Sequence, residues 1–253
     1  MARIDLNSDV GESFGNWSIP DASMLSIVSS ANVACGFHAG DPLTIRGTLQ
    51  SAVEKGVAVG AHIGYRDLAG FGRRFIDYHP RELSAEVIYQ LGALDGLARA
   101  AGTRIRYVKP HGGMYNTIVH HKDQAHAVID AIAEYDETLP VLLLPGGYAL
   151  DYARKQGLRG VAEAFADRAY NPDGTLVSRR EPGAVIDDAG QVVENMLRLA
   201  QDGVLIARDG TRIRTEAESI CTHGDTAGAA QMAATLRSAL EDAGVQIRSF
   251  VEA

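Results

Sequence analysis

Seven side chains able to bind a metal, move a proton or hold an anion lie in short, glycine-containing motifs of this 253-residue chain. Most of these motifs come directly after an apolar run of strand character. In a parallel α/β barrel the carboxyl ends of the strands meet on one face, where active sites are built. The motifs therefore predict one pocket, with a candidate catalytic set of Asp9, His38, His62, Lys109, His111, His223 and Asp225.

Two carboxylates, Asp9 and Glu12, follow the first expected strand in the motif DLNSDVGESFG. There they could bind a metal, act as a general base or hold a catalytic histidine or lysine. A turn followed by a helix start explains them equally well, because Asp and Ser favour turns and Glu favours the first helical turn. The local sequence leaves both interpretations open.

Lys109 and His111 stand two residues apart in the motif VKPHGGMYN. Residues i and i+2 of a strand share a face, so the two side chains can point together unless Pro110 twists the chain. Such a pair suits an anionic substrate and a proton transfer, since histidine titrates near neutral pH. A surface lysine at a strand end is the structural alternative. Asp225, two residues after His223, could likewise orient an imidazole.

The histidines raise the question of a divalent metal. Imidazole and carboxylate groups are common ligands of zinc, yet no HExxH spacing points to such a site. Whether a metal binds stays open at this stage. If one does, its ligands are expected among Asp9, His38, His62, His111 and His223.

Two further ionisable residues have structural explanations. Asp41 directly precedes Pro42 and is expected to cap a helix. Cys35 is expected to be a small buried residue, as free cysteines usually are. The remaining histidines lie in stretches that flank helices and are expected to be solvated: His79, His120, His121 and His126.

Candidate substrate contacts come from loops. The segment GYRDLAGFGRR has three glycines and suggests a mobile cover, whose arginine could reach a carboxylate or phosphate. In FADRAY, an internal pair of Asp167 with Arg168 is as plausible as a substrate contact. The predicted substrate-binding residues are Glu12, Tyr65, Arg73, Asn116 and Arg168.

Strand-like and helical patterns alternate along the chain, which predicts an α/β fold with a mostly parallel sheet. Strands are expected at residues 4–7, 26–34, 57–61, 105–109, 141–144, 161–165 and 219–222. Helices are expected at residues 42–55, 80–101, 122–137, 150–156, 189–201 and 227–243. Seven strands are easier to count than eight, so an irregular or incomplete (β/α) barrel is predicted, as one domain over residues 1–253. Asp209–Gly210 predicts a hairpin with a type I′ turn.

Composition excludes several classes. A net charge of −8 argues against non-specific nucleic-acid binding, and four lysines give no polybasic membrane patch. There is no 18-residue apolar stretch, no signal-peptide pattern and no cysteine framework, so a cytoplasmic protein is expected. The sequence also lacks a P-loop, a GxSxG elbow and a GxGxxG fingerprint.

Six collinear motifs resemble the LamB/YcsF family: IDLNSDVGESFG, ANVACGFHAGDP, GAHIGYRDLAGFGRR, VKPHGGMYN, FADRAYNPDGTLVSR and ICTHGD. The resemblance runs from about Arg3 to Gly244. Departures from the family pattern are Ser8, Ile63, Gly113–Met114 and Ser178. None of them removes an ionisable candidate, so they bear on packing more than on chemistry.

The resemblance implies a seven-stranded (β/α) barrel related to glycoside hydrolases and polysaccharide deacetylases. Characterised family members are the A component of the bacterial 5-oxoprolinase, which works with subunits B and C. The resemblance also implies a reaction, the opening of 5-oxo-L-proline to L-glutamate. ATP is the co-substrate and is converted to ADP and phosphate. Two other functions remain open: a metal-dependent deacetylase or amidohydrolase, and a non-catalytic substrate-binding subunit.

Overall fold

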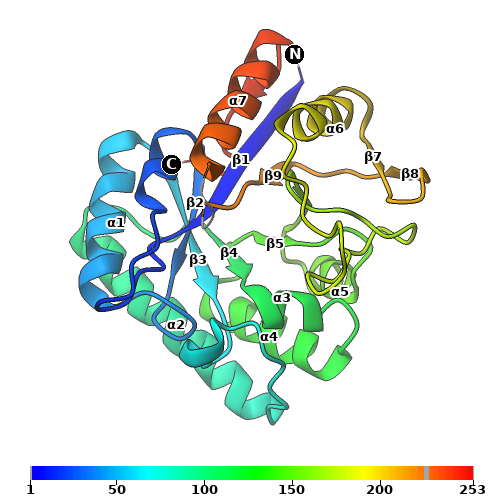
Figure 1. Cartoon of the computed structure of the whole chain (residues 1–253). Coiled ribbons are helices and arrows are strands. Elements are labelled where there is room, and N and C mark those ends of the chain that lie inside the picture. The colour runs from blue at the N-terminus through cyan, green and yellow to red at the C-terminus, as the bar shows by residue number, and fades with distance from the viewer. Residues whose placement is uncertain (1, 225–227, 253) are drawn as a thin grey trace.

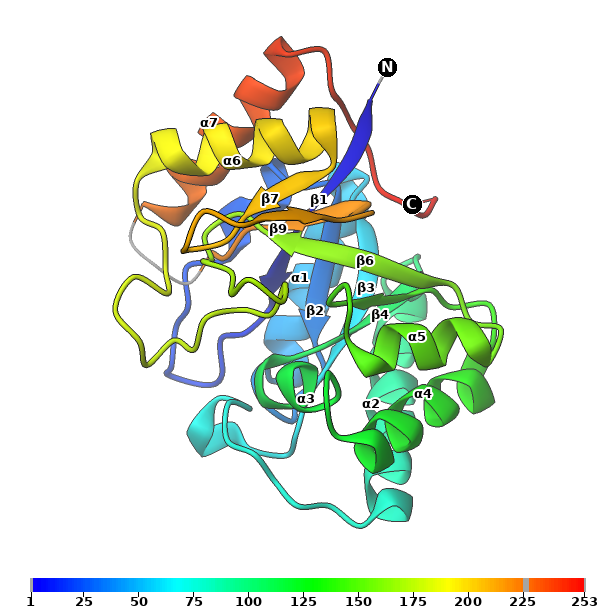
Figure 2. The ribbon, with the colours of Figure 1, turned by 90° about the vertical axis from the view of Figure 1, so that its right-hand side faces the viewer.

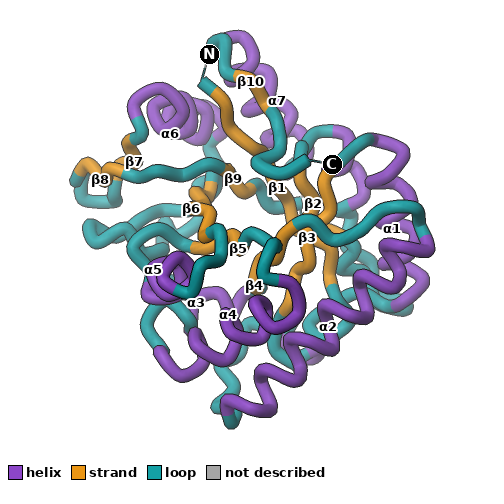
Figure 3. The backbone as a smooth tube through the Cα atoms, turned by 180° about the vertical axis from the view of Figure 1, so that it is seen from behind, coloured by secondary structure: helices purple, strands orange, loops and turns teal. Residues whose placement is uncertain are grey.

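A closed parallel barrel forms the centre of the molecule in the computed structural model, which describes residues 2–224 and 228–252 (Figures 1 and 3). Seven parallel strands of these residues follow one another around it: β1 (Arg3–Val10), β2 (Ser30–Ala34), β3 (Ala58–Ile63), β4 (Tyr107–Pro110), β5 (Val141–Leu143), β6 (Gly160–Phe165) and β9 (Ser219–Cys221). Strand β1 pairs with both β2 and β9, so the sheet closes. The predicted barrel of seven strands is confirmed, and it is complete.

Helices cover the outside of the barrel (Figure 3). They are α1 (Pro42–Lys55), α2 (Pro80–Ala100), α4 (Lys122–Asp136), α5 (Tyr148–Lys155), α6 (Ala189–Asp202) and α7 (Ala229–Asp242). Shorter elements are η1 (Ala22–Ser26), η2 (Leu68–Gly70), α3 (Gly112–Thr117) and β10 (Gln246–Ile247), which pairs with the start of β1. No helix among the described residues is long and apolar enough to span a membrane.

Helix α1 illustrates how the sequence sets an element's ends. The Asp41 side chain accepts hydrogen bonds from the amides of Leu43 and Thr44, which have no partner within the helix. Gly56 ends the helix in the left-handed conformation, with φ of 66°. Asp41 therefore caps α1, as predicted from the sequence.

The stretch after α6 departs from the barrel, as predicted. Strands β7 (Val204–Ile206) and β8 (Arg212–Arg214) form a separate antiparallel hairpin. The predicted type I′ turn is wrong, because it would need positive φ at Asp209, and Phe71 is the one described non-glycine residue with positive φ. Instead Gly210 alone has positive φ, and its amide bonds to the carbonyl of Ala207.

Polar side chains fill the inside of the barrel. Along β1, Ile4 and Leu6 belong to an apolar cluster, whereas Asp5 and Asn7 face the barrel axis. Asn7 donates to Glu163 at 2.8 Å, on β6, which only β9 separates from β1. Because these groups are buried, each needs a partner within the protein. The polar interior leads directly to the carboxyl ends of the strands.

Gly60 of β3 provides a test of this packing. A Cβ atom there would lie 2.2 Å from the ring of Tyr107, whose hydroxyl donates to Asn32 at 2.7 Å. Gly60→Ala is expected to lower the free energy of unfolding by about 1–3 kcal/mol through overpacking. Urea denaturation measures this, with Gly92→Ala as the control.

Gly92 lies on the exposed side of α2, where an added Cβ meets no atom within 4 Å. Its replacement should leave stability unchanged or raise it by up to about 1 kcal/mol. Equal stability of the two variants would contradict the described interior.

Candidate active site

A cavity of about 650 Å³ lies at the carboxyl ends of the barrel strands. The segments that follow β1, β3 and β6 project beyond the same side of the barrel (Figure 2). Residues from the strand ends line its floor: Asp9, His62, Lys109, His111 and His223. The predicted gathering of strand-end motifs into one pocket is thus seen in the fold. The catalytic role of these residues remains a prediction.

Lys109 lies almost fully buried at the floor of the cavity. Its ammonium group is 2.9 Å from Glu163 Oε1 and 3.2 Å from Asp9 Oδ1, Asn7 Oδ1 and Cys221 Sγ. Burial alone would lower the pKa of Lys109, but the charges of Asp9 and Glu163 raise it well above the usual value. Three ammonium hydrogens thus face four acceptors of the protein itself.

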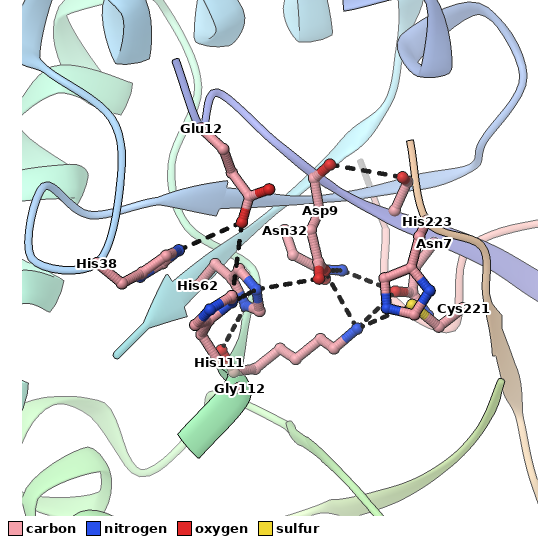
Figure 4. A network of polar contacts seen from close by, with 12 residues as sticks. Asn7, Asp9, Glu12, Asn32, His38, His62, His111, Gly112, Cys221 and His223 are labelled. Atoms are coloured by element: carbon pink, nitrogen blue, oxygen red, sulfur yellow. Dashed lines mark hydrogen bonds and ion pairs between the residues drawn. The ribbon is translucent and has the colours of Figure 1, made fainter. Parts of the chain in front are cut away.

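Asp9 connects this lysine to the histidines, and Figure 4 shows its contacts with Asn32 and His62. Its Oδ1 accepts from Asn32 at 2.8 Å and from Lys109, while its Oδ2 lies 3.2 Å from Nε2 of His62. Burial alone would raise the pKa of Asp9, but the charges of His62 and Lys109 hold it well below the usual value. Asp9 is therefore a carboxylate at neutral pH.

Backbone carbonyls fix the protons of two histidines. Nδ1 of His62 lies 3.0 Å from the carbonyl oxygen of Lys109, and Nε2 of His111 lies 2.8 Å from that of Phe71. A carbonyl can only accept, so both of these nitrogens carry hydrogen. Their other nitrogens lie 3.0 Å apart and face each other with lone pairs when both rings are neutral. Such an arrangement calls for a proton or a cation between the rings.

Glu12 and His38 complete this group, which we call the histidine cluster: Glu12, His38, His62 and His111. The His38 ring stacks on His111 at 3.8 Å, and its Nε2 is 3.4 Å from Glu12 Oε1 (Figure 4). One ligand atom from each residue lies within 4.8 Å of the others. Burial lowers the pKa of His38 and His111 well below the usual value, which keeps both neutral. Neutral imidazole with a second nitrogen held by a carbonyl is the usual form of a metal ligand. The cluster could therefore hold a metal ion.

A second group of ligand types, Asp9, Cys221 and His223, also comes together. The Lys109 ammonium lies 3.2 Å from both the Asp9 carboxylate and the Cys221 sulfur. That fixed positive charge opposes a second cation there. Burial also raises the pKa of the Cys221 thiol, and that of Cys35, well above the usual value. Neither cysteine is therefore prepared as a thiolate.

His223 is held from the segment that follows β6. Its Nδ1 lies 2.7 Å from Asp167 Oδ2, and its Nε2 lies 3.1 Å from a guanidinium nitrogen of Arg179. The alternative in which Asp167 pairs with Arg168 is wrong, because Arg168 instead donates to the carbonyls of Val177 and Ala184. Asp225, predicted to orient an imidazole, lies outside the described residues.

The segment after β3 closes over the histidine cluster. Asp67 accepts from the Gly70 amide at 3.0 Å and from Arg74 Nε at 2.9 Å, which fixes this turn. Phe71 follows in the left-handed conformation, with φ of 53°, which is costly for a bulky residue. Its carbonyl is the one that holds His111. Gly72 packs so closely that a Cβ would lie 2.6 Å from His38 Cβ.

The predicted substrate contacts divide into two groups. Arg73, Asn116 and Arg168 line the cavity, and so does Glu12. The prediction for Tyr65 is wrong: it is fully buried away from the cavity, with its hydroxyl bonded to Gln124, and burial raises its pKa to about 12.

Other placements also differ from expectation. His38 is fully buried behind His111 and does not border the cavity. No helix begins at Glu12, which belongs to the histidine cluster. His120 is exposed, as predicted, but lines the cavity mouth.

Two partners in the site are not predicted from the sequence: Glu163 and the carbonyl of Phe71. Asp167 is among the sequence candidates, but as a partner of Arg168 or of the substrate and not of His223. Glu163 lies on β6, in an apolar-looking run that predicts only a strand. Glu163 at its fourth position is an acid inside a buried strand, which is a signal that the sequence does carry. Nothing in the sequence marks a backbone carbonyl as a partner of His111.

The family match agrees with this fold and this arrangement of motif residues: residues 4–253 match the LamB/YcsF family, so the chain belongs to it. It is similar to the A component of 5-oxoprolinase from Kocuria rhizophila, with 62% identity over 99% of this chain and 100% of that protein. The corresponding protein of Corynebacterium jeikeium is 59% identical over 98% of this chain and 96% of its own.

Solved structures show the same relationship. A lactam utilization protein from Thermus thermophilus has a TM-score of 0.93 and 42% identity, with 98% of this chain and 100% of that chain covered. A family 4 carbohydrate esterase from Streptomyces lividans has a TM-score of 0.51 and 13% identity over 97% of this chain and 91% of that chain. The second comparison shows a shared fold only.

The Lys109 contacts give a prediction about stability. Lys109→Met is expected to lower the free energy of unfolding by about 3–5 kcal/mol at neutral pH, because it leaves Asp9 and Glu163 buried without their cation. This loss of stability should become smaller as the pH is lowered from about 7.5 to about 5, since protonation of a buried carboxylate removes the uncompensated charge. Urea denaturation at both values measures it.

In the wild-type protein, stability changes with pH in the opposite direction: acid lowers it. The pKa of Asp9 lies below its ordinary value of 3.8, so its stabilising contribution is complete above that pH and is lost only as the pH falls further. Lys55→Met, on the exposed end of α1, is the control and should change stability by less than about 0.5 kcal/mol. Equal effects of the two lysine substitutions would refute the buried ion network.

Proposed function

We propose that this cavity is where 5-oxo-L-proline is opened to L-glutamate, in a complex with 5-oxoprolinase subunits B and C and at the expense of ATP. The observation that carries the proposal is the carboxylate-bound histidine cluster at the floor of a cavity that arginines border. Two relatives whose sequences are 62% and 59% identical to this chain are named as the A component of 5-oxoprolinase. Both the chemistry and the partners are consistent with that name.

The floor of the cavity suits activation of water. Neutral His111, with its Nε2 hydrogen held by Phe71, presents Nδ1 as a proton acceptor. Asp9 stabilises the positive charge that a neighbouring imidazole gains when it takes a proton. If a divalent metal binds the histidine cluster, it supplies a bound water of lowered pKa.

Lys109 has a supporting role in this proposal. All of its hydrogens face protein acceptors, so it holds Asp9 in place and keeps it charged. Binding of the lactam's carboxylate falls instead to Arg73 and Asn116, which line the cavity, with Arg168 contacting another part of the substrate.

ATP is needed because an unstrained amide is a poor electrophile. Transfer of the γ-phosphoryl group to the lactam oxygen forms an O–P bond and breaks the bond to ADP. Water then adds to the ring carbon, the C–N bond breaks and the nitrogen takes a proton. A second water hydrolyses the resulting acyl phosphate to glutamate and phosphate.

The decisive experiment combines this protein with its subunits B and C and measures glutamate and phosphate formed from 5-oxoproline and ATP. His62→Ala and His111→Ala should each lower the rate of glutamate formation by about 100-fold or more. His126→Ala, in α4, should retain the rate. A complete mixture of folded wild-type proteins that forms no glutamate would refute the proposal.

The pH dependence of the same reaction has a defined sign. Burial and the neighbouring His62 lower the pKa of His111 below 6.5, so its neutral form persists into mildly acidic solution. The acidic limb of the rate should therefore fall below that value rather than at it.

Metal binding is tested without measuring activity. After incubation with Co²⁺ and dialysis, the protein should retain about one ion per chain and show a visible ligand-field spectrum. His62→Ala and His111→Ala should abolish it. His120→Ala, which lines the cavity outside the cluster, should retain it. A wild-type protein that binds no Co²⁺ stoichiometrically would contradict the metal site.

The same measurements separate the two alternative functions. Turnover of an acyl amide without ATP and without partners would indicate a stand-alone amidohydrolase or deacetylase. Saturable binding of 5-oxoproline together with full complex activity in the His62 and His111 variants would indicate a binding subunit.

A further inference from the structure

Three arginines border the cavity on its β6–β9 side. We call them the arginine rim: Arg168, Arg179 and Arg180. All come from the segment that follows β6, which runs beyond the strand ends in Figure 2. The water-activating residues proposed above lie at the floor, so the rim has no part in that step.

The protein fixes one of these guanidinium groups in place and steers a second. Arg168 is 7% exposed, and its Nη2 and Nε donate to the carbonyls of Val177 and Ala184. Arg179 donates from Nη2 to His223 at 3.1 Å. Two guanidinium groups are thus positioned without the help of any bound molecule. Arg180 is exposed beside them.

The rim concentrates more positive charge than the carboxylate beside it offsets. Among residues 2–224 and 228–252, no ion pair joins a carboxylate to Arg168, Arg179 or Arg180. The charge of Asp167, which contacts His223, acts on both Arg168 and Arg179, so one carboxylate stands beside three guanidinium groups. Burial and then the charge of Arg179 lower the pKa of Arg168 to about 10. The whole protein carries a net charge of −8, so this local excess is opposite to the overall charge. Like charges gathered at the edge of a cavity repel one another, and a bound anion offsets that repulsion.

The substrate's own carboxylate does not account for such a rim. One carboxylate carries one negative charge and is matched by one planar guanidinium. A phosphoryl group carries up to two charges and three terminal oxygens, which accept from several guanidinium groups at once. We propose that the arginine rim is a phosphoryl-binding subsite, and that it receives the phosphoryl group carried by the activated lactam. This inference rests on the proposed function.

Retention of that group has a chemical purpose. If phosphate left the adduct of water before the C–N bond broke, the lactam would be regenerated and the ATP wasted. A subsite that holds the phosphoryl oxygens lets the ring nitrogen leave first. The rim lies on the same cavity as the proposed water-activating floor, as this order of bond breaking requires.

The first test uses this protein without its partners and inorganic phosphate as the probe, measured by calorimetry. The double variant Arg179→Gln/Arg180→Gln changes two exposed side chains and should fold normally. It should bind phosphate about tenfold or more weakly than the wild type. Arg208→Gln removes an exposed arginine that pairs with Glu181 outside the cavity, and it should bind phosphate as the wild type does. Equal phosphate affinity of all three proteins overturns the subsite.

The second test identifies the phosphoryl group in the complete complex. If the group belongs to the activated lactam, the double variant should lower glutamate formation about tenfold or more while ADP formation that depends on 5-oxoproline continues. The ratio of ADP to glutamate then rises above the wild-type value. If glutamate and ADP fall together, the rim serves a nucleotide phosphate instead and the inference is wrong.

These experiments distinguish failure of the phosphoryl subsite from failure of the proposed function. A wild-type complex that forms no glutamate refutes the function itself. A wild-type complex that forms glutamate, alongside a double variant of unchanged rate and coupling, refutes only the phosphoryl subsite.

Discussion

The charge balance of Lys109 is the constraint on which the candidate site depends. An ammonium group buried at the bottom of a cavity is tolerated because Asp9 and Glu163 lie within 3.2 Å of it, on β1 and β6, which only β9 separates. The same residue orients His62 through its backbone carbonyl. One position of β4 therefore sets the ionisation of Asp9 and the proton position of its neighbouring imidazole. This role explains why Lys109 is better regarded as part of the site's framework than as an anchor for substrate.

Much of the fold could be predicted from the sequence, because apolar runs, helix caps and glycine stops are local signals. Asp41 caps α1, and seven strands form the barrel. The polar interior is not among the sequence-based predictions, although IDLNSDV carries its signal: the polar residues Asp5, Asn7 and Asp9 occupy every second position of the strand. Alternation in a parallel strand normally suggests solvent on one face, and here the polar face points into the barrel instead.

The site itself was predictable only in part. Strand-end histidines are recognisable because their motifs follow strands. The roles of Glu12 and Tyr65 depended on how loops fold back: Glu12 joins the histidines, while Tyr65 turns away to Gln124. Loop paths are set by tertiary contacts such as that of Asp67 with Arg74, for which a single sequence gives no distance. Backbone partners such as the Phe71 carbonyl are invisible to any analysis of residue types.

The loop after β3 links closure of the cavity to its chemistry. His111 has the proton on Nε2 only while the Phe71 carbonyl accepts it, and that carbonyl is aimed by a left-handed conformation that Phe71 would not adopt alone. Asp67 fixes the turn that contains Phe71 by accepting hydrogen bonds from Gly70 and Arg74. If the loop lifts, His111 loses its carbonyl partner, and its Nδ1 is no longer fixed as the acceptor. The loop that covers the histidine cluster is therefore also the element that prepares it, so solvent exclusion and proton-accepting capacity rise and fall together.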